Sequence, residues 1–183
     1  AVVAVTVPQE AADTLWRQRV RSGGRTNCAV IGAPGNTRCD SAIGELLESL
    51  PAREMLRFAF GNKRPPHINV GEMRSRRALW RTLAQDPRAH GRRHLVVYDS
   101  SATVGAGNKG RSPKSGMLRE ARLTYPYMLA ADCVEGTLWT DSERMPADGP
   151  SRRGHVQFPA PQREWVAAFL DGDQDALARR FGL

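Results

Sequence analysis

The pattern of apolar and polar residues first indicates a small number of β-strands. Residues 94–99 contain a short β-rich apolar run that ends in Asp99, and we interpret them as a buried central strand. Residues 134–140 alternate between apolar and polar side chains and predict a second strand. The run at 28–31 predicts a short strand, and the run at 55–60 a strand or an irregular apolar segment. The strand at 94–99 would carry its terminal carboxylate to the edge of a sheet, where binding sites commonly form.

Apolar residues spaced three and four positions apart predict helices between these strands. Asp40 or Ser41 is placed to cap the helix that starts at Ala42, and Glu72 falls in the first turn of the next helix. Pro126 is expected to interrupt the helix around it. The predicted helices cover residues 8–21, 42–50, 71 or 72 to 85, 115–131, 164–170 and 174–181.

The order of these elements indicates an α/β protein. A strand at 55–60, a helix and the strand at 94–99 follow one another, which favours a parallel pair joined by a right-handed crossover. With 183 residues, the chain has room for one domain with extensions but not for two ordinary domains. We therefore divide it into a mostly helical N-terminal extension, a core and a helical C-terminal tail, over residues 1–50, 51–153 and 154–183.

Positive charge is the strongest compositional signal. The chain has 27 Lys and Arg residues against 19 Asp and Glu, a net charge of +8, and only three of the 27 are lysines. Because a guanidinium group binds phosphate through two parallel hydrogen bonds, an arginine surplus favours a polyanionic partner such as RNA or DNA. A genome rich in G and C would also enrich arginine without any function, so both explanations stay open.

Cysteine usage and hydropathy narrow the class of protein further. Cys28, Cys39 and Cys133 are odd in number and lack Cys-x-x-Cys spacing, so neither a disulfide framework nor a zinc site is indicated. No apolar run approaches the ~20 residues that a membrane-spanning helix needs. The opening segment AVVAVTVP is too short for a signal peptide and lacks a basic flank. We expect an intracellular protein without a membrane partner.

The glycine-rich segment of residues 105–112 has two interpretations. Its three glycines match G-x-G-x-x-G, and the segment nearly matches a phosphate-binding P-loop. Both matches are poor, because Arg111 stands where a P-loop has lysine and the glycines come five residues after the strand. The alternative is a basic Lys-Gly-Arg-Ser turn that contacts a nucleic-acid backbone, with Asp99 as the functional residue.

Three carboxylates occupy comparable places in the predicted fold. Glu72 begins a helix, Asp99 ends the next strand, and Asp148 lies in a loop after a later strand, so all three can meet at one sheet edge. Hard oxygen ligands of this kind bind Mg²⁺, and two such ions can clamp the attacking and leaving oxygens of a phosphodiester. Each residue alone also has an ordinary structural interpretation, as a helix-dipole partner, a helix cap or a turn former respectively.

Four short motifs carry a resemblance to a known family. They are His-Ile-Asn-Val-Gly-Glu at 67–72, Asp-Ser at 99–100, Lys-Gly-Arg-Ser at 109–112 and Pro-Ala-Asp-Gly-Pro-Ser-Arg at 146–152. In this order they resemble the ribonuclease H-like (RNase H-like) domain of retroelement polyproteins, in particular the reverse transcriptases of tyrosine-recombinase retrotransposons. The resemblance implies a mixed sheet flanked by helices, with Glu72, Asp99 and Asp148 as Mg²⁺ ligands.

The sequence also departs from this family. Met145 stands where the family has Asn before Pro-Ala-Asp. Glycines in the segment before Lys-Gly-Arg-Ser weaken the helix that usually lies there, by about 1 kcal/mol each. The family's first catalytic Asp has no clear counterpart, and Asp40 is the residue at a plausible distance upstream of Glu72.

Two functions of different classes follow from the resemblance. One is a Mg²⁺-dependent endonuclease that cuts the RNA strand of an RNA–DNA hybrid, with Asp40, Glu72, Asp99 and Asp148 as its catalytic carboxylates. The other is a domesticated copy that keeps the fold and the basic surface without cleavage, and acts as a structural or RNA-binding subunit of a larger assembly. The residues expected to bind nucleic acid are Lys109, Arg111, Lys114, Arg119 and Arg152.

Overall fold

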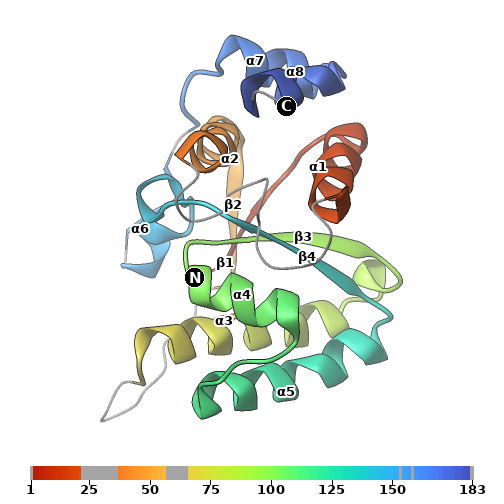
Figure 1. Cartoon of the computed structure of the whole chain (residues 1–183), viewed down its shortest axis with the longest axis vertical. Coiled ribbons are helices and arrows are strands. Elements are labelled where there is room, and N and C mark those ends of the chain that lie inside the picture. Colours follow the sequence, from red (N-terminus) through yellow and green to blue (C-terminus); the bar gives the residue numbers. More distant parts are fainter. Residues whose placement is uncertain (1, 22–36, 57–65, 153, 158, 182–183) are drawn as a thin grey trace.

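A computed structural model describes residues 2–21, 37–56, 66–152, 154–157 and 159–181. They form a mixed α/β structure with two small sheets (Figure 1). In chain order the elements are β1 (Val2–Val5), α1 (Gln9–Arg21), α2 (Thr37–Ser49), β2 (Ala52–Leu56), α3 (Ile68–Ala84), the 3-10 turn η1 (Pro87–Ala89), β3 (Arg93–Tyr98), α4 (Ser101–Lys109), α5 (Ser115–Ala130), β4 (Val134–Trp139), the 3-10 turn η2 (Ser142–Arg144), α6 (Asp148–Ser151), α7 (Glu164–Leu170) and α8 (Gln174–Phe181).

The parallel pair of β3 and β4 lies at the centre of the arrangement. Leu95 is opposite Gly136 and Tyr98 is opposite Trp139, and the chain passes from one strand to the other through α4 and α5. Because successive side chains of a strand point to opposite faces, Leu95 and Leu138 lie on one face while Tyr98 and Glu135 lie on the other. The two faces therefore have different chemical character.

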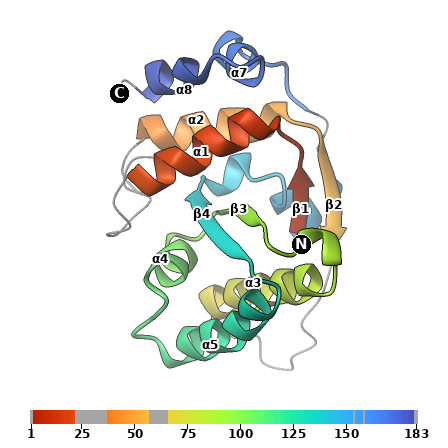
Figure 2. The ribbon, with the colours of Figure 1, turned by 90° about the vertical axis from the view of Figure 1, so that its right-hand side faces the viewer.

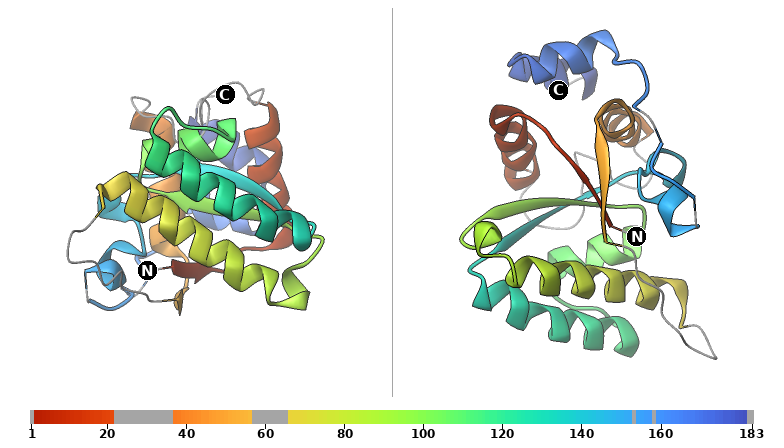
Figure 3. Two further views of the ribbon diagram at one scale, coloured as in Figure 1. Left: turned by 90° about the horizontal axis from the view of Figure 1, so that it is seen from below. Right: turned by 180° about the vertical axis from the view of Figure 1, so that it is seen from behind.

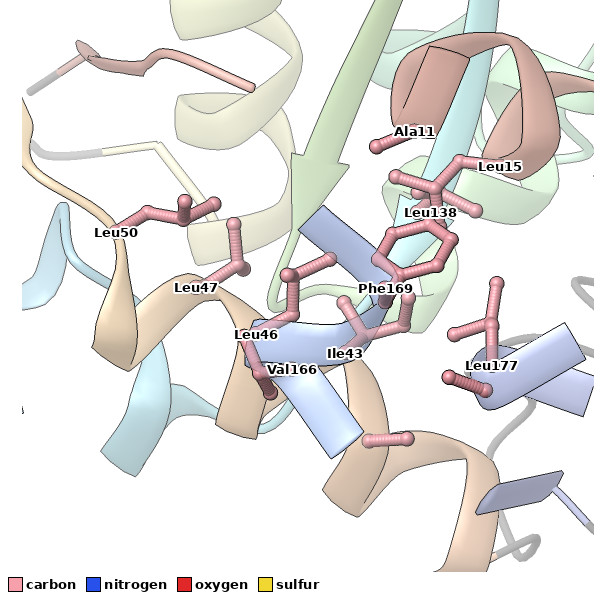
Figure 4. Packing of buried hydrophobic residues seen from close by; sticks show 12 residues of the cluster. Ala11, Leu15, Ile43, Leu46, Leu47, Leu50, Leu138, Val166, Phe169 and Leu177 are labelled. Carbon is pink, nitrogen blue, oxygen red and sulfur yellow. The ribbon is translucent and has the colours of Figure 1, made fainter. Parts of the chain in front are cut away.

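Helices cover both faces of this pair. α3, α4 and α5 lie on one side, where Figure 3 shows α3 and α5 side by side, and α1, α2, α7 and α8 lie on the other. The larger hydrophobic cluster joins the second group of helices to β4, with Leu15, Leu47, Leu138 and Leu177 among its buried members (Figure 4). Segments from both ends of the chain thus share one core with the central strands.

A glycine allows α1 to approach β4 closely. A Cβ atom at Gly136 would lie 2.6 Å from Cζ3 of Trp16 and 3.0 Å from a methyl carbon of Leu95. The first distance is shorter than real Cβ contacts, so a larger residue at this position would push α1 away from the sheet.

Several predicted elements are confirmed. β3 and β4 occupy the predicted strand positions, and the two C-terminal helices have the predicted bounds 164–170 and 174–181. The expectation that β3 is a buried central strand is wrong, because β3 is half-buried and, among the described residues, β4 is its only partner. α1 begins one residue later than predicted. Among the described helices, none combines the length and apolar character that a membrane span requires.

The predicted partner of β3 is wrong over the described residues. β2 pairs antiparallel with β1, Val5 lying opposite Ala52, and the parallel partner of β3 is β4 (Figure 2). The apolar residues of β1, for which we predicted no strand, provide the neighbour that β2 uses. Residues 57–60 and the predicted strand at 28–31 lie outside the described residues.

Two helices begin earlier than predicted. His67 caps α3, since its Nδ1 accepts the backbone N–H of Asn69 at 3.3 Å, so Glu72 lies in the second turn of the helix and not in the first. α2 begins at Thr37, so Asp40 and Ser41 lie within the helix instead of capping it. Histidine is an uncommon N-cap, since Ser, Thr, Asp and Asn usually occupy this position.

The expected interruptions of α4 and α5 are also absent. α5 continues through Pro126, which removes one backbone hydrogen bond, while Ala121 and Thr124 on the same helix are fully buried. α4 forms although it contains two glycines, because the Ser100 hydroxyl accepts the N–H of Thr103 at 3.2 Å and caps its start. Gly110, with a φ of 66°, ends the helix in the left-handed conformation that glycine adopts without strain.

Candidate functional site

Glu72 and Asp99 come together at the carboxyl end of β3. Asp99 directly follows this strand, and α3 places Glu72 beside the first turn of α4, where the Thr103 hydroxyl donates to Glu72 Oε2 at 2.9 Å. Burial raises the pKa of Glu72 above its ordinary value, and the negative charge of Asp99 adds to the rise. Hydrogen bonds from Ser100 and Thr103 and the charge of His67 oppose it. The pair is thus close enough for one carboxylate to influence the other.

Asp99 is also held by the chain that follows β4. Its Oδ2 accepts the hydroxyl of Ser142 at 3.3 Å, and its backbone carbonyl accepts Nε1 of Trp139 at 2.9 Å. Because β3 and β4 run parallel, both of these donors lie at the same end of the sheet as Asp99. The position of Asp99 is therefore set by two strands.

The third predicted carboxylate, Asp148, is bound to a cation of the chain itself. It begins α6, and its Oδ1 accepts Nε of Arg152 at 2.9 Å. Within the described parts of the chain, no three or more His, Cys, Asp and Glu side chains form a group that could hold a metal ion. The side chain of Asp40 lies outside the described residues. Two converging carboxylates do not complete the predicted Mg²⁺ site, so its occupation stays a prediction.

The predicted phosphate-binding residues lie in and beside the turn between α4 and α5. Lys109 ends α4, Arg111 and Lys114 lie in the turn, and Arg119 follows on α5; all four are exposed. Among the described residues, none of the four has a carboxylate partner within ion-pair distance. They differ in this respect from Arg152, whose charge Asp148 partly neutralises.

The structure does not support the P-loop interpretation of residues 105–112. A P-loop precedes its helix and points backbone N–H groups at the phosphate. Gly105 and Gly107 lie inside α4, where most backbone N–H groups bond within the helix. The basic-turn interpretation of the same segment remains.

A buried polar network surrounds Glu135, a residue that we did not predict to be functional. This residue of β4 binds side chains from α3 and from β3, and more than nine-tenths of its surface is buried. The sequence contains a sign of this network, because Arg76 lies between Met73 and Trp80 on the face of α3 whose other positions are apolar. A charged residue on each of two facing apolar surfaces indicates a buried ion pair.

No protein-family model, curated protein or solved structure was found to match this chain. Three features of the described residues bear on function. These are the Glu72 and Asp99 pair, the exposed cations in and beside the α4–α5 turn, and Asp148 with its partner Arg152.

Proposed function

We propose that this chain is a retroelement-derived, RNase H-like protein that binds RNA or RNA–DNA hybrids and cleaves them slowly or not at all. The observation that carries the proposal is the distribution of charge. Residues 67–133, which contain α3, α4 and α5, hold 12 of the 27 Lys and Arg residues but only 5 of the 19 Asp and Glu. Within this segment, α3, α4 and α5 themselves hold seven of these cations and two of these carboxylates, so the helices on one face of the sheet carry +5 of the net charge of +8.

The exposed cations on this face suit a phosphate backbone. Arg74 and Arg77 bind Glu120, and Arg76 is buried, so these three contribute little positive charge to the surface. Lys109, Arg111, Lys114 and Arg119 are exposed instead, and the first three lie within six residues of chain. Closely spaced exposed cations bind successive phosphates and make affinity depend strongly on salt.

The acidic residues support binding over cleavage. Two-metal cleavage needs several shared anionic ligands to offset the repulsion between the ions. Asp148 forms an ion pair with Arg152, which offsets part of its negative charge. Burial raises the pKa of Glu72 and so disfavours its charged form. Both features reduce the negative charge available to a metal ion.

The binding proposal is tested by fluorescence anisotropy with a labelled RNA–DNA hybrid over a range of salt concentrations. We expect log affinity to fall linearly with log salt, with a slope of about −0.9 for each neutralised phosphate of a duplex. Single-stranded RNA and double-stranded DNA of the same length show whether the hybrid is preferred. Absence of binding at low salt, or an affinity that salt does not change, would overturn the proposal.

The convergence of Glu72 and Asp99 favours one second candidate, a Mg²⁺-dependent ribonuclease H. It is tested by incubating the hybrid with the protein in Mg²⁺ or Mn²⁺ and following the RNA strand. Slow or absent cleavage, together with little change in binding for Asp99→Asn, supports the binding protein. Rapid cleavage that Asp99→Asn abolishes would establish the nuclease instead.

A further inference from the structure

Glu135 is the acceptor at the centre of a buried network. Its Oε2 lies 2.6 Å from Nη2 of Arg76 and accepts Nε1 of Trp80 at 2.7 Å, while its Oε1 accepts the hydroxyl of Tyr98 at 2.7 Å. Nε of Arg76 donates to both oxygens, at 3.2 and 2.9 Å. These donors use the roughly four acceptor positions of an ionised carboxylate.

The network joins three elements of the fold. Arg76 and Trp80 are four residues apart on α3 and so lie on one side of the helix. Tyr98 ends β3, and Glu135 lies near the start of β4 on the same face of the sheet. One carboxylate therefore binds the helix and its neighbouring strand simultaneously.

Two of the residues that bind Glu135 lie close in the chain to Glu72 and Asp99. Arg76 is one helical turn after Glu72 on α3, and Tyr98 is the residue immediately before Asp99. We infer that Glu135 is a positioning residue that sets α3 against the end of β3 and thereby holds Glu72 and Asp99 together. The inference goes beyond the proposed binding function, since this carboxylate pair is the feature that favours the second candidate, the nuclease.

Packing alone does not explain the network. A buried ion pair is commonly no more stabilising than apolar side chains of the same volume, because removing both charges from water is costly. Nη1 of Arg76 and the hydroxyl of Tyr125 are moreover buried without a hydrogen-bond partner among the described residues. Directional bonds to one carboxylate do what apolar contacts cannot, because they fix the rotation and the height of α3 relative to β3.

The test uses Tyr98→Phe, which removes one hydroxyl oxygen and leaves the ion pair of Arg76 and Glu135 intact. Methyl NMR of threonine residues reports the result, because the hydroxyl of Thr103 is bonded to Glu72 and its side chain is fully buried. We expect the Thr103 methyl signal to shift. The methyl signal of Thr14, which is buried on α1, should stay in place and serves as an internal control.

A matched variant separates positioning from general stability. Trp165→Phe removes an indole N–H that donates to Glu45 at 2.9 Å in the other helical layer. It should lower the stability of the protein while leaving the Thr103 signal unmoved. An unshifted Thr103 signal in Tyr98→Phe, or an equal shift in Trp165→Phe, would overturn the inference.

Hybrid-binding measurements on the same variants distinguish a failure of this inference from a failure of the proposed function. Hybrid affinity of Tyr98→Phe should stay within about twofold of the unaltered chain, because its exposed cations are unchanged. If the unaltered chain binds no hybrid, the proposed function fails, while the NMR comparison still decides whether Glu135 sets the geometry around Glu72. Glu135→Gln provides a second test, with a larger Thr103 shift expected, because the amide cannot bind all three donors.

Discussion

Thr103 donates its hydroxyl hydrogen to Glu72 at 2.9 Å, which joins the start of α4 to the second turn of α3. The bond links Glu72 to the segment that directly follows Asp99. Thr103 is itself placed by the capping hydroxyl of Ser100. The geometry around the carboxylate pair is therefore determined within one short segment, and substitutions there have specific expected effects.

Glu72→Gln should change how stability depends on pH. Because burial raises the pKa of Glu72, the folded protein holds this proton more firmly than the unfolded chain does. The resulting stability is fully present below the ordinary glutamate pKa of about 4.3 and is lost as pH rises through the higher folded value. Urea unfolding at about pH 4 and about pH 7 measures how much the free energy of unfolding falls between these two values. This fall should be smaller for Glu72→Gln than for the unaltered protein. Glu143→Gln, at an exposed carboxylate, controls for the loss of one charge.

Tyr98 should resist ionisation until the protein unfolds. Burial raises the pKa of Tyr98 far above its ordinary value, and the charge of Glu135 acts in the same direction. Stability from this group is present below about pH 10 and is lost as the pH rises further, because the unfolded chain then releases the proton first. Because the chain has three tyrosines, the contribution of Tyr98 is obtained as the tyrosinate absorbance that is missing in Tyr98→Phe. This contribution should appear at the same pH as the unfolding transition followed by circular dichroism. Early ionisation of one tyrosine that disappears in Tyr98→Phe would contradict this expectation.

Glu45→Ala should loosen the C-terminal helices. Glu45 of α2 is buried and accepts Nε1 of Trp165 on α7 at 2.9 Å and Nη2 of Arg180 on α8 at 2.7 Å. Breaking a fully buried ion pair costs about 3–5 kcal/mol, and the partial exposure of Arg180 lowers our expectation to about 2 kcal/mol. Urea unfolding measures the change. Glu164→Ala, at an exposed residue of α7, should change the free energy of unfolding by no more than about 0.5 kcal/mol. A loss as large as that of Glu45→Ala would refute the specific role of Glu45.

Lys114→Ala and Arg119→Ala should each reduce the salt dependence of hybrid binding. If each side chain neutralises one phosphate, the magnitude of the log–log slope should fall by about 0.9 per substitution. Arg88→Ala is the matched control, since Arg88 is exposed but lies on η1 and is paired with Asp86 at 3.0 Å. Equal effects of all three substitutions would indicate a diffuse attraction to net charge instead of contacts at the α4–α5 turn.

β3, β4 and the two C-terminal helices were predictable because local signals marked their ends. The apolar run before Asp99 and the alternation after Cys133 each defined a strand, and Pro161 and Gly172 bracket α7. Which strands pair with each other was harder to predict from the sequence. β1 carries no turn signal that links it to β2, and a contact between segments so far apart in the chain leaves no local trace.

The candidate site was predictable only in part, for a related reason. The motif spacing placed Glu72 and Asp99 at one edge of the sheet, but it contained no information about the partners of these residues. The contact of Asp148 with Arg152 is local and was open to prediction as an i, i+4 pair on a helix. The bonds of Glu135 to Arg76 and Tyr98 depend on how α3 sits on the sheet, and this emerges only when the elements are assembled.

The hydrophobic cluster on the α1 face has a consequence for synthesis on the ribosome. It joins Ala11 and Leu15 of α1 to Ala176 and Leu177 of α8, so α1 is covered by a helix that is synthesised much later. At translation rates of about 5–20 residues per second, the apolar face of α1 waits on the order of 10 seconds for α8 to be synthesised. During that interval the nascent chain exposes an apolar surface of the kind that chaperones recognise, and we expect its folding yield in cells to depend on them.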